Sequence, residues 1–207
     1  MKKVITIGRE FGSGGREIGH RIAEKLQIAY YDQEIVTEIA KRTQLSEEYV
    51  ERITENRPYI PYPINAGTSF HAPYYAYAEF DRSLTVFAEQ HNIIKELADK
   101  SDCVIVGRCA DYILKEKTPF RIFVYADAES KLKRCRERSP EDESLSDSKI
   151  RRNIRSIDKG RARYYNYFSR QKWGACENYD LLINTSGKDV KRVSEAVADY
   201  LKRYLFE

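Results

Sequence analysis

The sequence predicts an α/β fold built on a doubly wound, five-stranded parallel sheet. Short apolar runs rich in β-branched residues recur along the chain, and helically spaced apolar residues fill the intervals between them. A cluster of glycines separates the first run from the first helix. Strands joined by helices run parallel with right-handed crossovers. The 207 residues (24.2 kDa) suffice for one such unit, so we expect a single domain over residues 1–207.

The first strand is predicted at residues 3–7, where the chain is apolar and β-branched. The first helix follows the glycines, because apolar residues recur at helical spacing over residues 18–26. Residues 28–31 predict a short second strand that ends at Asp32. The Asp32 carboxylate can cap the helix that carries the apolar residues 35–40.

A shorter helix is predicted from residue 46 to about residue 53. Over residues 56–78 prolines and tyrosines are interleaved, and the apolar residues follow neither a helical nor a strand periodicity, which predicts a long loop. Helical spacing returns over residues 80–98. The apolar run at residues 103–106 is typical of a buried parallel strand, and Gly107 ends it.

The C-terminal part of the chain predicts two more strands and three helices. The strands are expected at residues 121–125 and 180–183. The helices are expected at about residues 128–137, 148–167 and 190–204. A polar, acidic turn separates the first two of these helices, and the second is strongly basic.

Composition excludes several classes of protein. Hydrophobic residues make up 42% and charged residues 33%, too apolar for a disordered chain and too charged for a membrane protein. No run of about 18 apolar residues exists, and the four cysteines lack the C-x-x-C spacing of zinc sites. We therefore expect a cytoplasmic protein without membrane contact. The net charge of +4 is too small to favour nucleic acid, although residues 121–163 carry a local charge of +5.

The glycine cluster is the strongest functional signal in the chain. Glycines between a strand and a helix let backbone N–H groups turn toward one point, and the helix N-terminus adds positive charge there. We predict a donor-phosphate site from the following residues: Gly8, Arg9, Gly12, Ser13, Gly14, Gly15, Arg16 and Glu17. The alternative is a glycine-rich turn that binds nothing.

This loop departs from the P-loop pattern G-x-x-x-x-G-K-[ST]. Gly15 stands where that pattern has its lysine, and Glu17 stands where it has its hydroxyl residue. The positive charge for the phosphates must therefore come from elsewhere, and Arg16 and Arg9 are the candidates. A Mg²⁺ contact would pass to Ser13, to water, or to Glu17 through a metal-bound water, so no protein ligand is assigned to the metal.

Several segments resemble the cytidylate kinases, and more closely their relatives with a lysine-free glycine loop. The matching segments are residues 4–15, Tyr30-Tyr31-Asp32, residues 104–111, Asp158-x-x-Arg161 with Tyr164-Tyr165, and residues 179–185. The resemblance covers residues 1–42 and about 80–207. It implies a P-loop nucleoside monophosphate kinase that uses ATP and Mg²⁺. In such a kinase residues 43–100 form a helical acceptor-binding insertion and residues 134–155 a short arginine-rich lid.

The resemblance also implies acceptor-binding residues: Asp32, Arg108, Asp158 and Arg161. The family's Gly-Arg-Asp is Gly107-Arg108-Cys109 here, so one acidic contact is missing or passes to Asp111. Independently of the family, Arg108 follows a buried strand at its carboxyl end, where open α/β sheets bind ligands. A structural pair between Arg108 and Asp111 is the alternative.

Arginines crowd both sides of the predicted lid. Phosphoryl transfer needs positive charge around the moving group, preferably delivered as a lid closes. We predict a catalytic set of Arg16, Arg155, Arg161 and Arg163, the last three because they lie nearest Asp158. For each arginine the alternative is a solvated helical hairpin with i,i+4 ion pairs.

The Tyr/Pro-rich segment at residues 57–79 has three interpretations. It can stack an acceptor base, form a contact in a homo-oligomer, or fold its rings onto the surface as a plain loop.

The sequence leaves several functions open. We expect ATP-dependent phosphorylation of a nucleoside monophosphate, with CMP or dCMP as the first choice. A kinase for another small metabolite and a non-catalytic nucleotide-binding module are the alternatives, because residues 43–79 match the family poorly and the loop lacks its lysine. Nucleic-acid binding would require an affinity that falls as salt rises.

Overall fold

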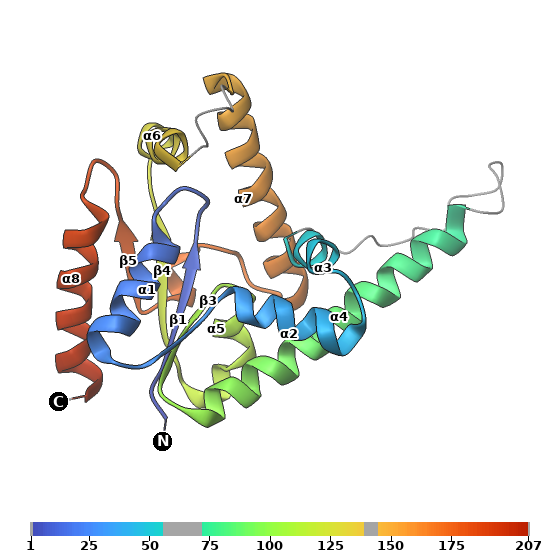
Figure 1. The fold of residues 1–207 in the computed structure, drawn as a ribbon, viewed down its shortest axis with the longest axis horizontal. Helices are drawn as coiled ribbons and strands as arrows, with labels where there is room; N and C mark the ends of the chain where they lie inside the picture. The colour runs from blue at the N-terminus through green and yellow to red at the C-terminus, as the bar shows by residue number, and fades with distance from the viewer. Residues whose placement is uncertain (1, 56–71, 139–144, 207) are drawn as a thin grey trace.

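The computed structural model describes residues 2–55, 72–138 and 145–206. A five-stranded sheet forms its centre (Figure 1). The strands are β1 (Val4–Arg9), β2 (Ala29–Tyr31), β3 (Cys103–Val106), β4 (Phe120–Tyr125) and β5 (Leu181–Asn184). Their order is β2-β3-β1-β4-β5, and neighbouring strands are parallel. The predicted doubly wound parallel sheet is confirmed, and each strand lies within three residues of its predicted limits.

Helices cover both faces of the sheet (Figure 1). One face carries α1 (Gly15–Leu26) and α8 (Val190–Leu201), followed by a π-helical segment, Lys202–Phe206. The other face carries α2 (Gln33–Thr43), α3 (Glu47–Thr54), α4 (Ala72–Lys100), α5 (Ala110–Ile113) and α7 (Asp147–Ser169). Short 3-10 turns lie at Lys115–Lys117 and Cys176–Asn178.

Alternate strand residues divide the core into two clusters. Val104 and Val106 of β3 pack on the α1 and α8 side, whereas Cys103 and Ile105 pack on the other side. A continuous apolar run therefore serves both faces, as expected for a parallel strand buried on each side. This packing fixes the carboxyl ends of β1 and β3 next to each other.

The helix α6 (Ala128–Arg138) packs with the start of α7 in a third, smaller cluster. Its buried members are Leu132, Ile150 and Ile154, and Phe11 of the glycine loop packs against them. The two arginine-rich helices therefore contact the loop that follows β1. The described residues of the expected lid, 134–155, belong to these two helices.

The structure corrects two secondary-structure predictions. The helix α4 begins at Ala72, so residues 72–78, expected in a loop, are helical. Alanine and tyrosine there tolerate a helix, and Pro73 lies in its first turn, where a missing N–H costs nothing. The short α5 was not predicted, because four residues show no helical period.

Two other expectations remain predictions. The Tyr/Pro-rich segment lies largely outside the described residues, including residues 57–71. The insertion expected at residues 43–100 includes α3 and α4. Within the described part of the chain, no helix has the length and apolar character needed to cross a membrane.

Candidate functional site

A cavity of about 570 Å³ opens at the carboxyl end of the sheet. The loop between β1 and α1 forms one wall, and residues of α3, α6 and α7 form the others. Six arginines line it: Arg9, Arg16, Arg108, Arg134, Arg138 and Arg161. Three glutamates line it as well: Glu10, Glu51 and Glu55. The arginine excess suits an anionic ligand.

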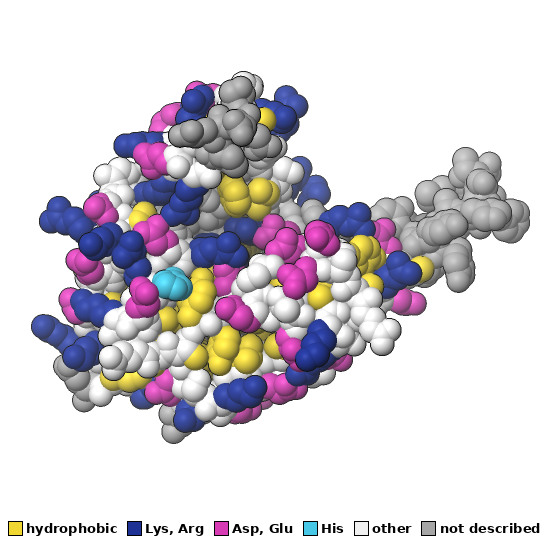
Figure 2. All heavy atoms as spheres, viewed as in Figure 1, with side chains coloured by type: hydrophobic (Ala, Val, Ile, Leu, Met, Phe, Trp, Pro, Cys, Tyr) yellow, Lys and Arg dark blue, Asp and Glu magenta, His cyan; other side chains and the backbone are white. Residues whose placement is uncertain are grey.

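Lys and Arg side chains also gather on the outer surface near this cavity. Figure 2 shows them over the part of the face where Figure 1 draws α6 and the first turns of α1. The positive charge of the site therefore continues to the surface, where it can attract an anion.

The glycine loop is shaped by residues with positive φ and by close packing. Gly12 has φ 74° and Gly14 has φ 85°, a region that side chains with a Cβ rarely enter. A Cβ on Gly14 would lie 2.8 Å from a Val190 methyl. No side chain caps the N-terminus of α1, so its first N–H groups remain free to bind an anion. Five of the eight predicted donor residues line the cavity, namely Arg9, Gly12, Gly14, Gly15 and Arg16, whereas Gly8, Ser13 and Glu17 do not.

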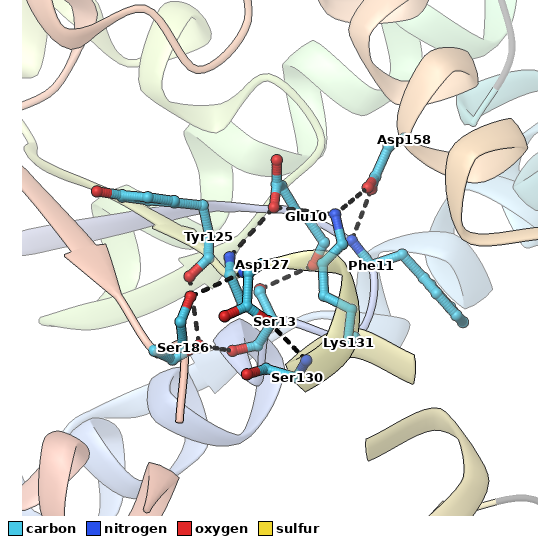
Figure 3. Close-up of polar contacts among 12 residues, drawn as sticks. Glu10, Phe11, Ser13, Tyr125, Asp127, Ser130, Lys131, Asp158 and Ser186 are labelled. Carbon is cyan, nitrogen blue, oxygen red and sulfur yellow. Dashed lines mark hydrogen bonds and ion pairs between the residues drawn. The ribbon is translucent and has the colours of Figure 1, made fainter. Parts of the chain in front are cut away.

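A buried lysine ties the outside of this loop to both arginine-rich helices (Figure 3). Lys131 of α6 donates to Glu10 Oε2 at 3.0 Å and to Asp158 Oδ2 at 2.8 Å. Asp158 Oδ1 accepts the Phe11 N–H at 2.6 Å. Burial would lower the pKa of Lys131, but the two carboxylates raise it above its ordinary value. Three chain segments are thus held by one ammonium group.

The predicted magnesium contacts do not fit the groups present. The Ser13 hydroxyl is buried and donates to the Glu10 carbonyl at 2.8 Å. Glu17 accepts from Arg21 through Oε1 at 3.0 Å and from Arg138 through Oε2 at 2.6 Å. Neither residue is among those that line the cavity. No cluster of three metal-ligating side chains exists among the residues described.

Asp32 is placed at the N-cap of α2, yet its carboxylate does not cap that helix. Its Oδ2 accepts from Arg16 Nε, and its Oδ1 lies 3.8 Å from Arg9 Nη2. The Asp32 N–H instead donates to Glu34 at 3.1 Å. The capping prediction is therefore wrong, because two arginines compete more strongly for the carboxylate than backbone N–H groups do.

Arg108, which follows β3, and Arg161 of α7 both line the cavity. Arg108 donates through Nη1 to Thr54 Oγ1, and its carbonyl accepts from Gln90 at 2.8 Å. Arg161 donates to Glu55 Oε1 through Nη2 at 2.8 Å. Burial lowers the pKa of Arg108. Burial alone would raise the pKa of Glu55, but the charge and hydrogen bond of Arg161 hold it below its ordinary value.

Asp111 does not take up the predicted acceptor contact in the main cavity. It is buried and accepts from the Tyr165 hydroxyl at 2.6 Å, and burial raises its pKa. The alternative pair between Arg108 and Asp111 does not form within the described residues, where Arg108 bonds Thr54 and Asp111 bonds Tyr165. Asp111 instead lines a much smaller pocket beside Gly107 and Arg108.

Two members of the predicted catalytic set lie away from the cavity. Arg155 and Arg163 are exposed on α7 and are not among the cavity residues. Arg161 shares the inward face of α7 with Ile150 and Ile157, and helical spacing directs the other two arginines elsewhere. The structure therefore brings together Arg16 and Arg161 from that set, but not Arg155 or Arg163.

The comparisons with known proteins decide the family. A model of the cytidylate kinase-like family matches residues 4–187. This chain belongs to the cytidylate kinase-like family. Among curated proteins no significant match was found.

Solved structures share this fold. The crystal structure of an uncharacterized protein from Eubacterium ventriosum is 26% identical, with a TM-score of 0.68 over 97% of this chain and 99% of the other. Shikimate kinase from Bacteroides thetaiotaomicron is 16% identical, with a TM-score of 0.56 over 99% of each chain. Shikimate kinase from Acinetobacter baumannii in complex with shikimate is 14% identical, with a TM-score of 0.52 over 100% of this chain and 96% of that one. The two shikimate kinases share the fold.

Sequence reasoning missed several residues of this candidate site. Glu10, Glu55 and Lys131 hold the groups that line it. Glu10 lies inside the glycine loop and could have been singled out there. Lys131 and Glu55 carry no motif, because each meets its partner only through the packing of α6, α3 and α7.

Proposed function

We propose that this protein transfers the γ-phosphoryl group of ATP to a nucleoside monophosphate, with CMP or dCMP as the first candidates. One observation carries the proposal. One cavity has the glycine loop on one wall and, on the others, arginines from β1, from the turn after β3 and from α7. Its volume of about 570 Å³ lies within the range of small-molecule sites.

The glycine loop and the N-terminus of α1 would hold the donor phosphates. Free N–H groups and the helix dipole attract negative charge there. Arg16 is the second residue of this helix and its side chain is 62% exposed, so its Nη groups can donate to a phosphate while Asp32 accepts from its Nε. Ser13 supports the loop through its bond to Glu10 rather than touching the ligand.

The acceptor would lie on the side of Arg108 and Arg161. A planar guanidinium binds a phosphate through two parallel hydrogen bonds. Arg108 is buried, and its Nε has no hydrogen-bond partner in the described structure, so a donor is available there. Asp32 and Asp158 would act less directly, Asp32 by orienting Arg9 and Arg16 and Asp158 by holding the loop and Lys131.

The reaction needs little covalent help from the protein. An ionised phosphate oxygen of the acceptor is already a nucleophile, so no general base is required. The arginines would neutralise charge that develops on the transferring group. Mg²⁺ would accompany ATP and reduce the charge of its phosphates, with phosphate and water oxygens as its ligands, because Ser13 and Glu17 are already engaged.

A specific observation favours a second candidate acceptor. The acid of the family's Gly-Arg-Asp is replaced by Cys109, which is buried, and Asp111 is bonded to Tyr165. A base whose recognition depends on that acid would bind less well here. Another phosphorylated or hydroxylated small molecule is therefore the alternative substrate of the same cavity.

The proposal is tested by a coupled assay of ADP release. ATP and Mg²⁺ are supplied with CMP, dCMP, UMP, AMP, GMP or dTMP, and with no acceptor. We expect turnover with one or two pyrimidine monophosphates well above the acceptor-free rate. If none of the six raises ADP release above the acceptor-free rate, although a separate measurement shows that ATP binds, these nucleoside monophosphates are rejected as acceptors. Another substrate, or a nucleotide-binding module without turnover, would then be favoured.

A further inference from the structure

Arg9 is a buried cation with few partners. It ends β1, its side chain is 11% exposed, and it lines both the large cavity and the small pocket beside Gly107. No hydrogen bond from its guanidinium is found within the described residues. Its ion-pair partner there is Asp32, at 3.8 Å, beyond hydrogen-bond distance.

The surrounding chain is shaped to place this guanidinium between the two halves of the site. A Cβ on Gly107 would overlap Arg9 Nη1, so the guanidinium crosses the end of β3 where only glycine leaves room. Gly107 also has φ 72°. A Cβ on Gly15 would lie 2.5 Å from Arg9 Cβ, so the stem of the side chain packs on the last glycine of the loop. Arg9 therefore contacts both the glycine loop and the turn that carries Arg108.

This placement is unfavourable without a ligand. Burial, together with the positive charges of Arg161 and Arg108, lowers the pKa of Arg9 to about 9, although Asp32 and Glu55 oppose the shift. A neighbouring donor, Arg108 Nε, is also buried without a hydrogen bond in the described structure. Buried cations and unsatisfied donors cost stability, and such a cluster in a native protein calls for an explanation. An anion between the guanidinium groups provides one.

We propose that Arg9 does the work of the missing P-loop lysine, and that its guanidinium donates hydrogen bonds to both the γ-phosphoryl group of ATP and the phosphate of the acceptor. Arg9 is thus a catalytic residue that holds two phosphates together. Arg16 is less suited to this role, because its side chain is mostly exposed and its Nε is held by Asp32. This inference rests on the proposed phosphoryl transfer.

The step is balanced without any further reactant. An acceptor phosphate oxygen forms a bond to the γ-phosphorus as the bond from that phosphorus to the β,γ-bridging oxygen breaks. The electron pair leaves with ADP, and the acceptor gains one phosphoryl group. Arg9 keeps its proton throughout and stabilises charge on both sides of the bond change.

The test compares Arg9→Met and Arg9→Lys with the wild type and with Arg121→Met. Arg121 is a matched control because it lies at the start of β4, outside the cavity residues, and pairs with Asp180 at 2.7 Å. We expect Arg9→Met to lower kcat about 100-fold. Arg9→Lys should retain more activity than Arg9→Met, and Arg121→Met should remain within about twofold of the wild type.

Thermal unfolding separates this role from a structural one. Without ligand, Arg9→Met should melt at the wild-type temperature or above it, because a poorly paired buried charge has been removed. Inorganic tripolyphosphate should raise the melting temperature of the wild type and of Arg121→Met, and should barely raise that of Arg9→Met.

Two results would overturn the inference. One is Arg9→Met with wild-type kcat and a wild-type response to tripolyphosphate. The other is a lowered melting temperature of Arg9→Met without ligand, with activity lost in proportion to the unfolded fraction. If the wild type turns over no acceptor, the proposed function fails, whereas the tripolyphosphate measurement still decides whether Arg9 binds phosphate.

Discussion

At the scale of single residues, the arginines around the cavity differ sharply in their surroundings. Arg108 is buried against Thr54 with one donor unused, whereas Arg16 is largely exposed and Arg138 pairs with Glu17. Only some of them can therefore act on a ligand without first breaking an existing contact. Their separate roles can be tested by separate substitutions.

Arg108→Ala should weaken acceptor binding more than donor binding. Arg108 lies two residues after the end of β3, and a charged hydrogen bond to a phosphate contributes about 1.5–3 kcal/mol. We expect the acceptor KM to rise about 30-fold, and the ATP KM to change less than about threefold. Steady-state kinetics with each substrate varied in turn makes the measurement, and an equal loss for both substrates would contradict the assignment.

Gly14→Val should abolish donor binding. Gly14 has φ 85°, and a side chain there would meet Val190 and obstruct the approach of a phosphate to the backbone. Gly174→Val is the control, because Gly174 has φ 74° and a close neighbour in Phe123, yet lies outside the cavity residues. ATP titrations should show binding to the control and none to Gly14→Val. Wild-type ATP affinity in Gly14→Val would refute the loop as the donor site.

At the scale of secondary-structure elements, the ion pairs of Lys131 and Arg161 join the elements that surround the cavity. Lys131 connects α6 to the glycine loop and to α7, and Arg161 connects α7 to Glu55 at the end of α3. Because these contacts cross between elements distant in the sequence, no local pattern could reveal them. They hold the loop and the two arginine-rich helices in one arrangement.

Lys131→Met should destabilise the protein by about 2 kcal/mol, because Glu10 and Asp158 would be left side by side and poorly solvated. Lys133→Met on the same helix is the matched control. Lys133 is 79% exposed and lies 4.0 Å from Glu137, so its loss should cost less than about 0.5 kcal/mol. Urea denaturation of both variants measures the difference, and equal stabilities would show that the buried contact contributes nothing.

The Glu55 to Arg161 pair should make stability depend on pH. The lowered pKa of Glu55 means that its carboxylate stabilises the fold above the pKa it has when unfolded, and that this contribution disappears as pH falls through its folded value. Glu55→Gln should therefore melt below the wild type at pH 7, and the two should converge below about pH 4. Thermal melts across pH make the comparison, and a difference that stays constant into acid would exclude the ion pair as its cause.

At the scale of the whole molecule, the sequence predicted the sheet well because its strands are short apolar runs between helices. The glycine cluster also located the cavity correctly, because the conformation of a glycine loop is determined by neighbouring residues in the sequence. By contrast, the capping role predicted for Asp32 and the catalytic roles predicted for Arg155 and Arg163 depended on where distant elements meet. In the structure the Asp32 carboxylate pairs with Arg9 and Arg16, and Arg155 and Arg163 are exposed.

The difference between local sequence patterns and contacts between distant elements also explains why the sequence did not reveal some buried residues. Lys131 belongs to a basic stretch in which seven of the eleven residues of α6 are charged, so nothing local separates it from its exposed neighbours. Its partners are Glu10, in the glycine loop after β1, and Asp158 of α7, which are both distant from Lys131 in the sequence. Only the packing of α6 on the loop makes this lysine different.

The central claim is that one cavity joins a nucleotide donor to a nucleoside monophosphate acceptor. The most direct measurement follows a labelled γ-phosphoryl group of ATP in the presence of Mg²⁺ and CMP or dCMP. We predict that the label appears in the corresponding nucleoside diphosphate, at a rate that depends on both substrates and that falls in Arg108→Ala. Label that remains in ATP, or appears solely as inorganic phosphate, would contradict the account.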